Sequence, residues 1–358
     1  MSKKTIFNIL KYVLGLGVGL LLLYLALSGV ELTEVKTALK EADYTWVGAG
    51  VVLALLSHWF RAARWKMLYR AAGYESNTLN LFAATMIGYM VNQAVPRAGE
   101  ISRVTLASRT EKIPLGVSFG TVVTDRIFDV VILAALIFGV VITQLDEISM
   151  IMDKIFATVP AEGAAQESGG GLLKWIILGV GVLGIALFVI FRKKIYANKY
   201  GQKLQGFLKE TWSSVKSVRK MNQPLMFVVY TIGIWICYVL MTYLVFFALE
   251  GSADLSFVFA LTVFTMGGIG IVIPSPGGIG TYHFAVIMTF VAYAPQLGMT
   301  EEVARTLGTN IAFIIHTSQL IMMIVVGFLC YLFLIPRLRV ANEEEAAAGA
   351  PDAQPAEV

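Results

Sequence analysis

Residues 257–294 read FVFALTVFTMGGIGIVIPSPGGIGTYHFAVIMTFVAYA. Two apolar segments, 257–273 and 282–294, flank a break that holds Pro274, Pro276 and several glycines. Each segment is shorter than the roughly 20 helical residues that cross a hydrocarbon core. Proline removes a backbone donor and glycine loosens the turn, so a break at membrane depth needs protein or water around it. The stretch therefore predicts a re-entrant pair of half-helices.

The composition indicates a membrane protein as well. Of 358 residues, 57% are hydrophobic and 15% charged, and the mean hydropathy is +0.73. A water-soluble surface needs far more charge, which excludes a soluble enzyme. The net charge of +4 does not indicate nucleic-acid binding, because the cations gather in short segments between apolar runs. Cys237 and Cys330 have no metal-site or disulfide spacing, and we expect no cofactor.

The apolar runs fall into two groups. Six are interpreted as full crossings: 6–27, 46–60, 127–145, 172–191, 225–249 and 307–335. Four are too short or too interrupted: 79–95, 114–123, 257–273 and 282–294. We therefore predict an all-α polytopic membrane protein with six full transmembrane helices and two pairs of re-entrant half-helices.

Loop charges predict the topology. Cations gather in three loops, which are 61–75, 97–112 and 192–224, whereas three others, 29–45, 146–171 and 250–254, are acidic. Because basic loops stay in the cytoplasm, both termini are expected there, in a bacterial inner membrane.

The order of segments occurs twice. Units 46–145 and 225–335 each read as span, short segment, proline–glycine break, short segment and span. They face opposite ways, and interrupted short segments in inverted repeats point to a transport site. The linker 172–224 includes a basic segment, 192–223, expected as an amphipathic helix on the cytoplasmic leaflet.

These parts form one expected domain. It covers residues 1–340, and an Ala/Glu/Pro-rich tail, 341–358, is expected to be disordered.

The first break suggests a phosphate site. Pro96 and Gly99 interrupt the helix, next to Asn92. Arg97 and Arg103 would face the inner end of a cavity, where a guanidinium binds phosphate through paired hydrogen bonds. The alternative is that both arginines are ordinary markers of the cytoplasmic side.

The span at 127–145 begins with a charged group. Asp125 and Asp129 share one helical face, with Arg126 beside them. Ionisable groups in a span are functional candidates, so these three and Glu100 are expected to tune charge or couple protons. A purely structural ion cluster is the alternative. Two carboxylates without histidine are a weak metal signal, and no metal is expected.

The second break suggests an anion site made of backbone. Gly277, Gly278 and Gly280 permit close approach, and a helix expected near Thr281 would present its N-terminal N–H groups. His283 could relay protons or donate to phosphate, or it could hydrogen-bond a carbonyl. No Lys-Ser/Thr follows these glycines, so the stretch is not a nucleotide-binding P-loop.

Four motifs together resemble the lysylphosphatidylglycerol synthase transmembrane-region family, also called flippase-like or UPF0104. They are Arg61-x-x-Arg64-Trp65, Asn92 to Glu100, Thr124-Asp125-Arg126 with Asp129, and Pro274-x-Pro276-Gly277-Gly278-x-Gly280. The resemblance covers about residues 5–335 and implies movement of aminoacylated phospholipid between leaflets. The soluble transferase domain of full synthases is not expected here. The family usually has an acidic residue where this chain has His283.

The favoured hypothesis is a flippase that translocates a phospholipid or a polyprenyl-linked or glycolipid substrate. Its partners would be membrane lipids carrying phosphate, without nucleic acid, and a homo-oligomer is left open. One alternative is a membrane-embedded lipid-linked glycosyltransferase or lipid-modifying enzyme with Asp125 or Asp129 as base. An accessory membrane subunit or a solute transporter is another.

Overall fold

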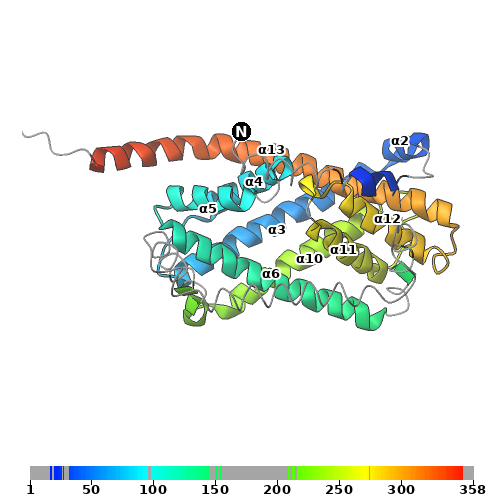
Figure 1. Ribbon diagram of the computed structural model, residues 1–358, viewed down its shortest axis with the longest axis horizontal. Helices are drawn as coiled ribbons and strands as arrows, with labels where there is room; N and C mark the ends of the chain where they lie inside the picture. Colours follow the sequence, from blue (N-terminus) through cyan, green and yellow to red (C-terminus); the bar gives the residue numbers. More distant parts are fainter. Residues whose placement is uncertain are drawn as a thin grey trace, which may run out of the picture.

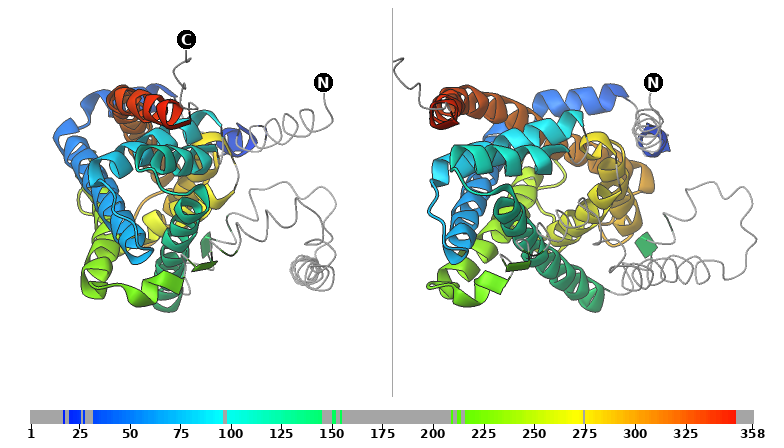
Figure 2. Two further views of the ribbon diagram at one scale, coloured as in Figure 1. Left: turned by 90° about the vertical axis from the view of Figure 1, so that its left-hand side faces the viewer. Right: turned by 60° about the vertical axis from the view of Figure 1, so that its left-hand side comes forward.

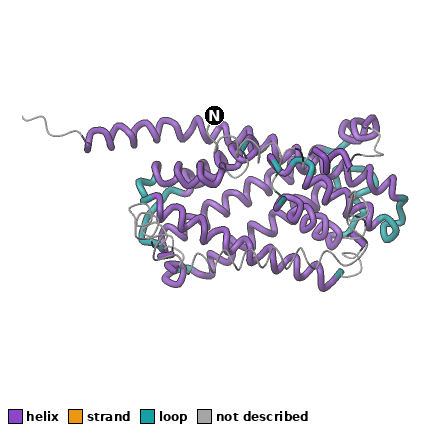
Figure 3. The backbone as a smooth tube through the Cα atoms, in the orientation of Figure 1, coloured by secondary structure: helices purple, strands orange, loops and turns teal. Residues whose placement is uncertain are grey.

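The computed structural model describes residues 32–95, 98–144, 216–273 and 275–349, together with single positions within 17–27, 150–154 and 209–213. Every regular element in these ranges is a helix (Figures 1 and 3). The elements are α2 (Leu32–Glu41), α3 (Tyr44–Ala71), α4 (Thr78–Ala94), α5 (Ala98–Thr110), α6 (Leu115–Thr143), η1 (Val218–Lys220), α10 (Pro224–Phe246), α11 (Phe257–Val272), η2 (Pro276–Gly278), α12 (Thr281–Tyr293) and α13 (Glu301–Gly349).

Four helices are long and apolar enough to cross a membrane: α3, α6, α10 and the Glu301–Leu334 part of α13. They correspond to four of the six predicted crossings. The crossing predicted at 172–191 and most of the one at 6–27 lie outside the described residues, as does most of the amphipathic segment 192–223. The count of six stays a prediction.

Helices α3 and α10 form an antiparallel pair along one side of the bundle, as the left-hand view of Figure 2 shows. At one end the backbone N–H of Asp43, the N-cap of α3, donates to the carbonyl of Ala248 at 2.9 Å. Toward the other end Arg64 of α3 donates to Thr231 of α10 at 3.3 Å. This pair sets the frame on which the shorter helices pack.

Helices α4 and α5 form the first hairpin. Asn80 donates to Glu111 at 2.7 Å, which ties the start of α4 to the end of α5. The two helices approach closely where a Cβ on Gly99 would lie 1.9 Å from the carbonyl oxygen of Gly88. The Gly99 N–H donates to the Asn92 side chain at 2.7 Å. Only glycine at position 99 fits this contact.

Helices α11 and α12 form the second hairpin in the same manner. The rings of Phe259 and Tyr293 lie 4.9 Å apart at its open end. Near the break, a Cβ on Gly270 would lie 2.6 Å from the carbonyl oxygen of Thr281. The helical segments predicted at 79–95, 257–273 and 282–294 are therefore confirmed as short helices.

The break between α11 and α12 reaches the first hairpin. Gly277, Gly278 and Gly280 have φ of 60°, 77° and 84°, a region that side chains with a Cβ rarely adopt. A Cβ on Gly277 would lie 2.7 Å from the side-chain oxygen of Gln93, near the end of α4. The tips of the two hairpins therefore meet inside the bundle.

Two sequence predictions are wrong about element limits. The segment 114–123 is not a separate half-helix, since α6 runs unbroken from Leu115 to Thr143. The basic segments 61–75 and 97–112 are largely helical, in α3 and α5, because their arginines have partners inside the protein. Helix α13 extends to Gly349, since alanine and glutamate favour helix, and so includes the first part of the tail 341–358, whose expected disorder stays a prediction.

Candidate functional site: a buried ion network beside a central cavity

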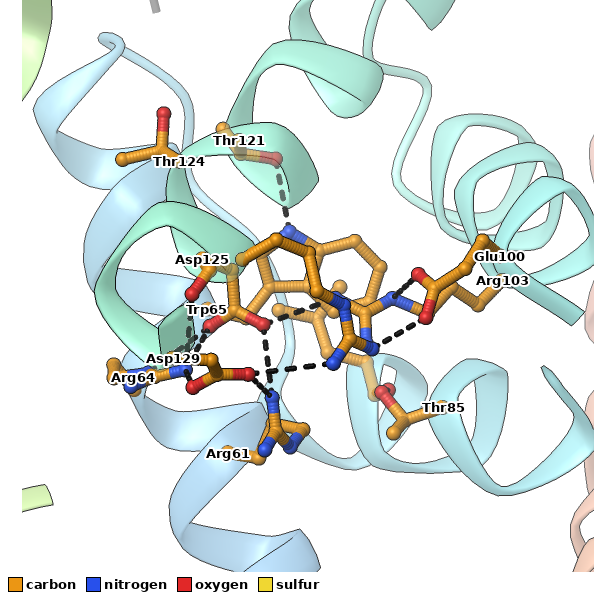
Figure 4. A network of polar contacts seen from close by, with 12 residues as sticks. Arg61, Arg64, Trp65, Thr85, Glu100, Arg103, Thr121, Thr124, Asp125 and Asp129 are labelled. Carbon is orange, nitrogen blue, oxygen red and sulfur yellow. Dashed lines mark hydrogen bonds and ion pairs between the residues drawn. The ribbon is translucent and has the colours of Figure 1, made fainter. Parts of the chain in front are cut away.

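Two arginines of α3 face two aspartates of α6 (Figure 4). Arg64 Nη2 lies 2.6 Å from Asp125 Oδ1 and 2.7 Å from Asp129 Oδ1. Arg61 Nη1 lies 2.5 Å from Asp129 Oδ2 and 3.2 Å from Asp125 Oδ2. Spacings of three and four residues place each pair on one face of its helix. The network therefore joins α3 to α6.

Helix α5 adds a second layer to the network. Arg103 Nη2 lies 3.2 Å from Asp125 Oδ2, and its guanidinium stacks 4.7 Å above the Trp65 ring. Glu100 pairs with Arg103, at 3.5 Å, and also with Arg126 of α6. Arg126 in turn lies 3.3 Å from Asp129 Oδ2. Three helices are thus tied together by charge.

The network has more arginine than carboxylate. Within the described residues it contains four arginines against three carboxylates, and so carries one net positive charge. Asp125 and Arg64 are fully buried, and Arg61 and Arg103 are nearly so. Breaking a buried pair strands a charge in a medium that solvates it poorly, so such a cluster strongly favours one arrangement of its helices.

A cavity of about 480 Å³ lies directly beside the network, between α3, α4, α6, α10, α11, η2, α12 and α13. Arg61, Arg126 and Asp129 form its charged end. The remaining wall carries aromatic, apolar and neutral polar groups. It includes His58, Tyr89, Gln93, Leu133, Trp235, Tyr238, Thr242, Phe264, Gly277, Tyr282, His316 and Gln319. A mostly apolar cavity with a few converging polar groups is the usual form of a ligand site.

The second break contributes to the cavity wall. Gly277 lines the cavity itself. His283 at the start of α12 is buried, and its ring stacks on His316 of α13 with centroids 4.7 Å apart. The Gly280 N–H donates to His283 Nδ1 at 3.4 Å. The His283 ring therefore accepts a hydrogen bond from the backbone. Of the two histidines, His316 is the one that lines the cavity.

The structure divides the predicted site residues into three groups. Arg126, Asp129 and Gly277 line the cavity. A second group does not line the cavity but lies in the helices and the break around it. These residues are Asn92, Gly99, Glu100, Arg103, Asp125, Pro276, Gly278, Gly280 and His283. Pro96, Arg97 and Pro274 lie outside the described residues. Arg103 in particular is engaged by Asp125 and Glu100 behind the cavity wall, unlike the open phosphate ligand expected from its position.

Sequence reasoning missed Arg61, Arg64, His58 and His316 as site residues. For the arginines a signal exists, because two cations three residues apart match two acids four residues apart on another helix. The positive-inside rule instead assigns both arginines to a cytoplasmic loop. In the described part of the chain, no cluster of three or more His, Cys, Asp or Glu could hold a metal.

Comparison with known proteins identifies relatives. A Haloferax volcanii protein named glycosyltransferase AglD is 28% identical over 355 aligned residues, which cover 92% of this chain and 56% of that protein. A UPF0104 membrane protein of Methanothermobacter thermautotrophicus is 24% identical over 282 residues, 73% of this chain and 79% of the relative. The chain thus spans about half the length of AglD.

A UPF0104 membrane protein of Methanocaldococcus jannaschii is 30% identical over a shorter stretch of 106 residues, 29% of this chain and 32% of the relative. No solved structure matches the chain. The family described as the lysylphosphatidylglycerol synthase transmembrane region matches residues 12–327, which include both hairpins, the ion network and the cavity. The apolar helices and this match together show a membrane protein. The chain belongs to the lysylphosphatidylglycerol synthase transmembrane-region family.

Proposed function

We propose that the chain translocates a phospholipid, or a polyprenyl-linked or glycolipid substrate, between the leaflets of its membrane. The observation that carries this proposal is the central cavity, whose charged end lies among helices long enough to cross a bilayer. A lipid headgroup needs a polar path through the hydrocarbon, while its tails remain stable in lipid. The cavity would hold the headgroup during the passage.

The element order supports an inverted-repeat transporter. The order α3, α4, α5, α6 is matched by α10, α11, α12, α13, and in each set two short helices meet at a break. Contacts correspond as well, since α4 packs on α13 and α11 packs on α6. We propose that both hairpins are re-entrant, one from each side, with the chain termini in the cytoplasm. Sites of this kind form where repeats with interrupted helices meet.

The second candidate is a lipid-linked transferase. It is favoured by the likeness to a protein named a glycosyltransferase, although the chain spans about half of that protein. The geometry argues against Asp125 as a base. Its Oδ1 accepts from Arg64, and its Oδ2 accepts from Arg61 and Arg103. A carboxylate held by three guanidinium groups is a poor proton acceptor.

The proposal is tested with purified protein in liposomes that contain a fluorescent phospholipid or polyprenyl phosphate, by following quenching with dithionite. Exchange above that of protein-free liposomes is expected for at least one lipid class. Leu133→Trp would fill the cavity and should abolish exchange, whereas Leu329→Trp, on an exposed face of α13, should not. If no lipid class exchanges, with or without a proton gradient, the flippase proposal is wrong.

A further inference from the structure

We infer that the central cavity selects a lipid with an anionic phosphate and an uncharged, hydroxyl-bearing headgroup, and that it excludes headgroups carrying an amine. This inference rests on the proposal that a lipid enters the cavity. It sets this chain apart from the aminoacylated lipid that the family description names. The selectivity depends on which charged groups at the cavity a ligand can reach.

Among the described arginines of the network, Arg126 is the one that a ligand can reach. Its side chain is 38% exposed and lines the cavity, whereas Arg61, Arg64 and Arg103 are each at most 3% exposed. Arg126 contacts Glu100, which is itself 36% exposed. A phosphate could therefore replace a partly solvated partner without breaking the buried layer. Two parallel hydrogen bonds from a guanidinium suit phosphate geometry.

The described residues of the cavity wall offer no free carboxylate to an amine. Among the described residues that line the cavity, Asp129 is the one carboxylate. Its Oδ1 contacts Arg64 at 2.7 Å, and its Oδ2 contacts Arg61 at 2.5 Å and Arg126 at 3.3 Å. An ammonium group entering the cavity would lose its hydration and meet a network that is already positive.

The rest of the wall suits hydroxyl groups. Gln93, Tyr89, Thr242, His316 and Gln319 carry side-chain groups that can donate or accept hydrogen bonds. Glycerol and inositol headgroups offer hydroxyls of both kinds.

Aromatic rings in the same wall provide an interaction that would favour a cationic headgroup. The ring faces of Trp235 and Phe264 could attract a quaternary ammonium. Phosphatidylcholine therefore tests whether this cation–π attraction exceeds the repulsion by the positive ion network.

The test measures binding of dioctanoyl phosphatidylinositol, phosphatidylglycerol, phosphatidylcholine, phosphatidylethanolamine and lysylphosphatidylglycerol to the full chain in detergent by native mass spectrometry. We expect the first two to bind at least about tenfold more tightly than the three amine lipids, a difference of about 1.4 kcal/mol. Arg126→Gln should remove most of this preference. Arg70→Gln, at an exposed arginine outside the cavity, should leave the preference unchanged.

A variant that is expected to gain binding gives a result that misfolding cannot explain. Gln319→Glu keeps the side-chain shape and adds a carboxylate to the cavity wall, so it should strengthen binding of lysylphosphatidylglycerol relative to phosphatidylinositol. Equal binding of all five lipids, or no change in Gln319→Glu, would overturn the inference even if liposomes show exchange. Selective binding without exchange in liposomes would support the binding site and contradict the flippase proposal.

Discussion

Replacing Asp125 by asparagine removes the charge shared by three buried arginines. In the intact protein the carboxylate lies 2.6 Å from Arg64 and 3.2 Å from both Arg61 and Arg103. The variant leaves four arginines against two carboxylates in the network. Breaking a buried ion pair costs about 3–5 kcal/mol. Because Asp129 still contacts Arg61 and Arg64, we expect a loss near the lower limit, about 3 kcal/mol in the free energy of unfolding.

The assay is equilibrium unfolding of the purified protein in mixed micelles by SDS titration, followed by circular dichroism. The matched control is Glu75→Gln, which makes the same chemical change in the exposed Arg70–Glu75 pair. Exposed pairs contribute about 0–1 kcal/mol, so the control should unfold almost as the parent does. If Asp125→Asn loses no more stability than Glu75→Gln, the network does not hold α3, α5 and α6 together, and the reasoning is refuted.

Two further substitutions test local packing. Gly99→Ala would push a Cβ into the backbone of α4 and should destabilise the first hairpin measurably in the same titration, whereas Gly139→Ala, with open space around it, should be neutral or stabilising. Trp65→Phe loses the 2.8 Å hydrogen bond to Thr121 and part of a fully buried ring, and should cost about 2 kcal/mol. Trp59→Phe, at an exposed ring, should change the unfolding midpoint little; equal effects of both tryptophan changes would contradict the assigned packing.

The sequence predicts helices correctly where a single physical rule determines where they begin and end. The second hairpin follows from Pro274, Pro276 and the glycines between two short apolar segments, since such a break cannot face lipid. The glycines with positive φ lie where the motif placed the turn. The same rule gives the wrong bounds for the first hairpin. It places a gap between two helices at the polar residues around Asp125, whereas α6 is continuous there.

The site was predicted only in part, because charge was read as a marker of loops. Counting Arg61 and Arg64 as cytoplasmic loop charges assumes that they are solvated, yet both are buried against α6. Their partners lie more than 60 positions away along the chain, so the matching spacings of the two pairs indicate a contact only once α3 and α6 are known to pack together. The stacking of His283 on His316 is likewise a product of how α12 packs on α13.

The ion network also has a consequence for how the chain enters its membrane. Helix α3 carries Arg61 and Arg64 in its second half, where each adds a cost below the value of about 2.5–3.5 kcal/mol for an arginine at the centre of an inserting helix. The neutralising aspartates are synthesised 61 or more residues later. At about 5–20 residues per second this delay lasts several seconds. Helix α3 is therefore expected to remain beside the insertion machinery until α6 emerges, so that the two helices enter the bilayer as a pair.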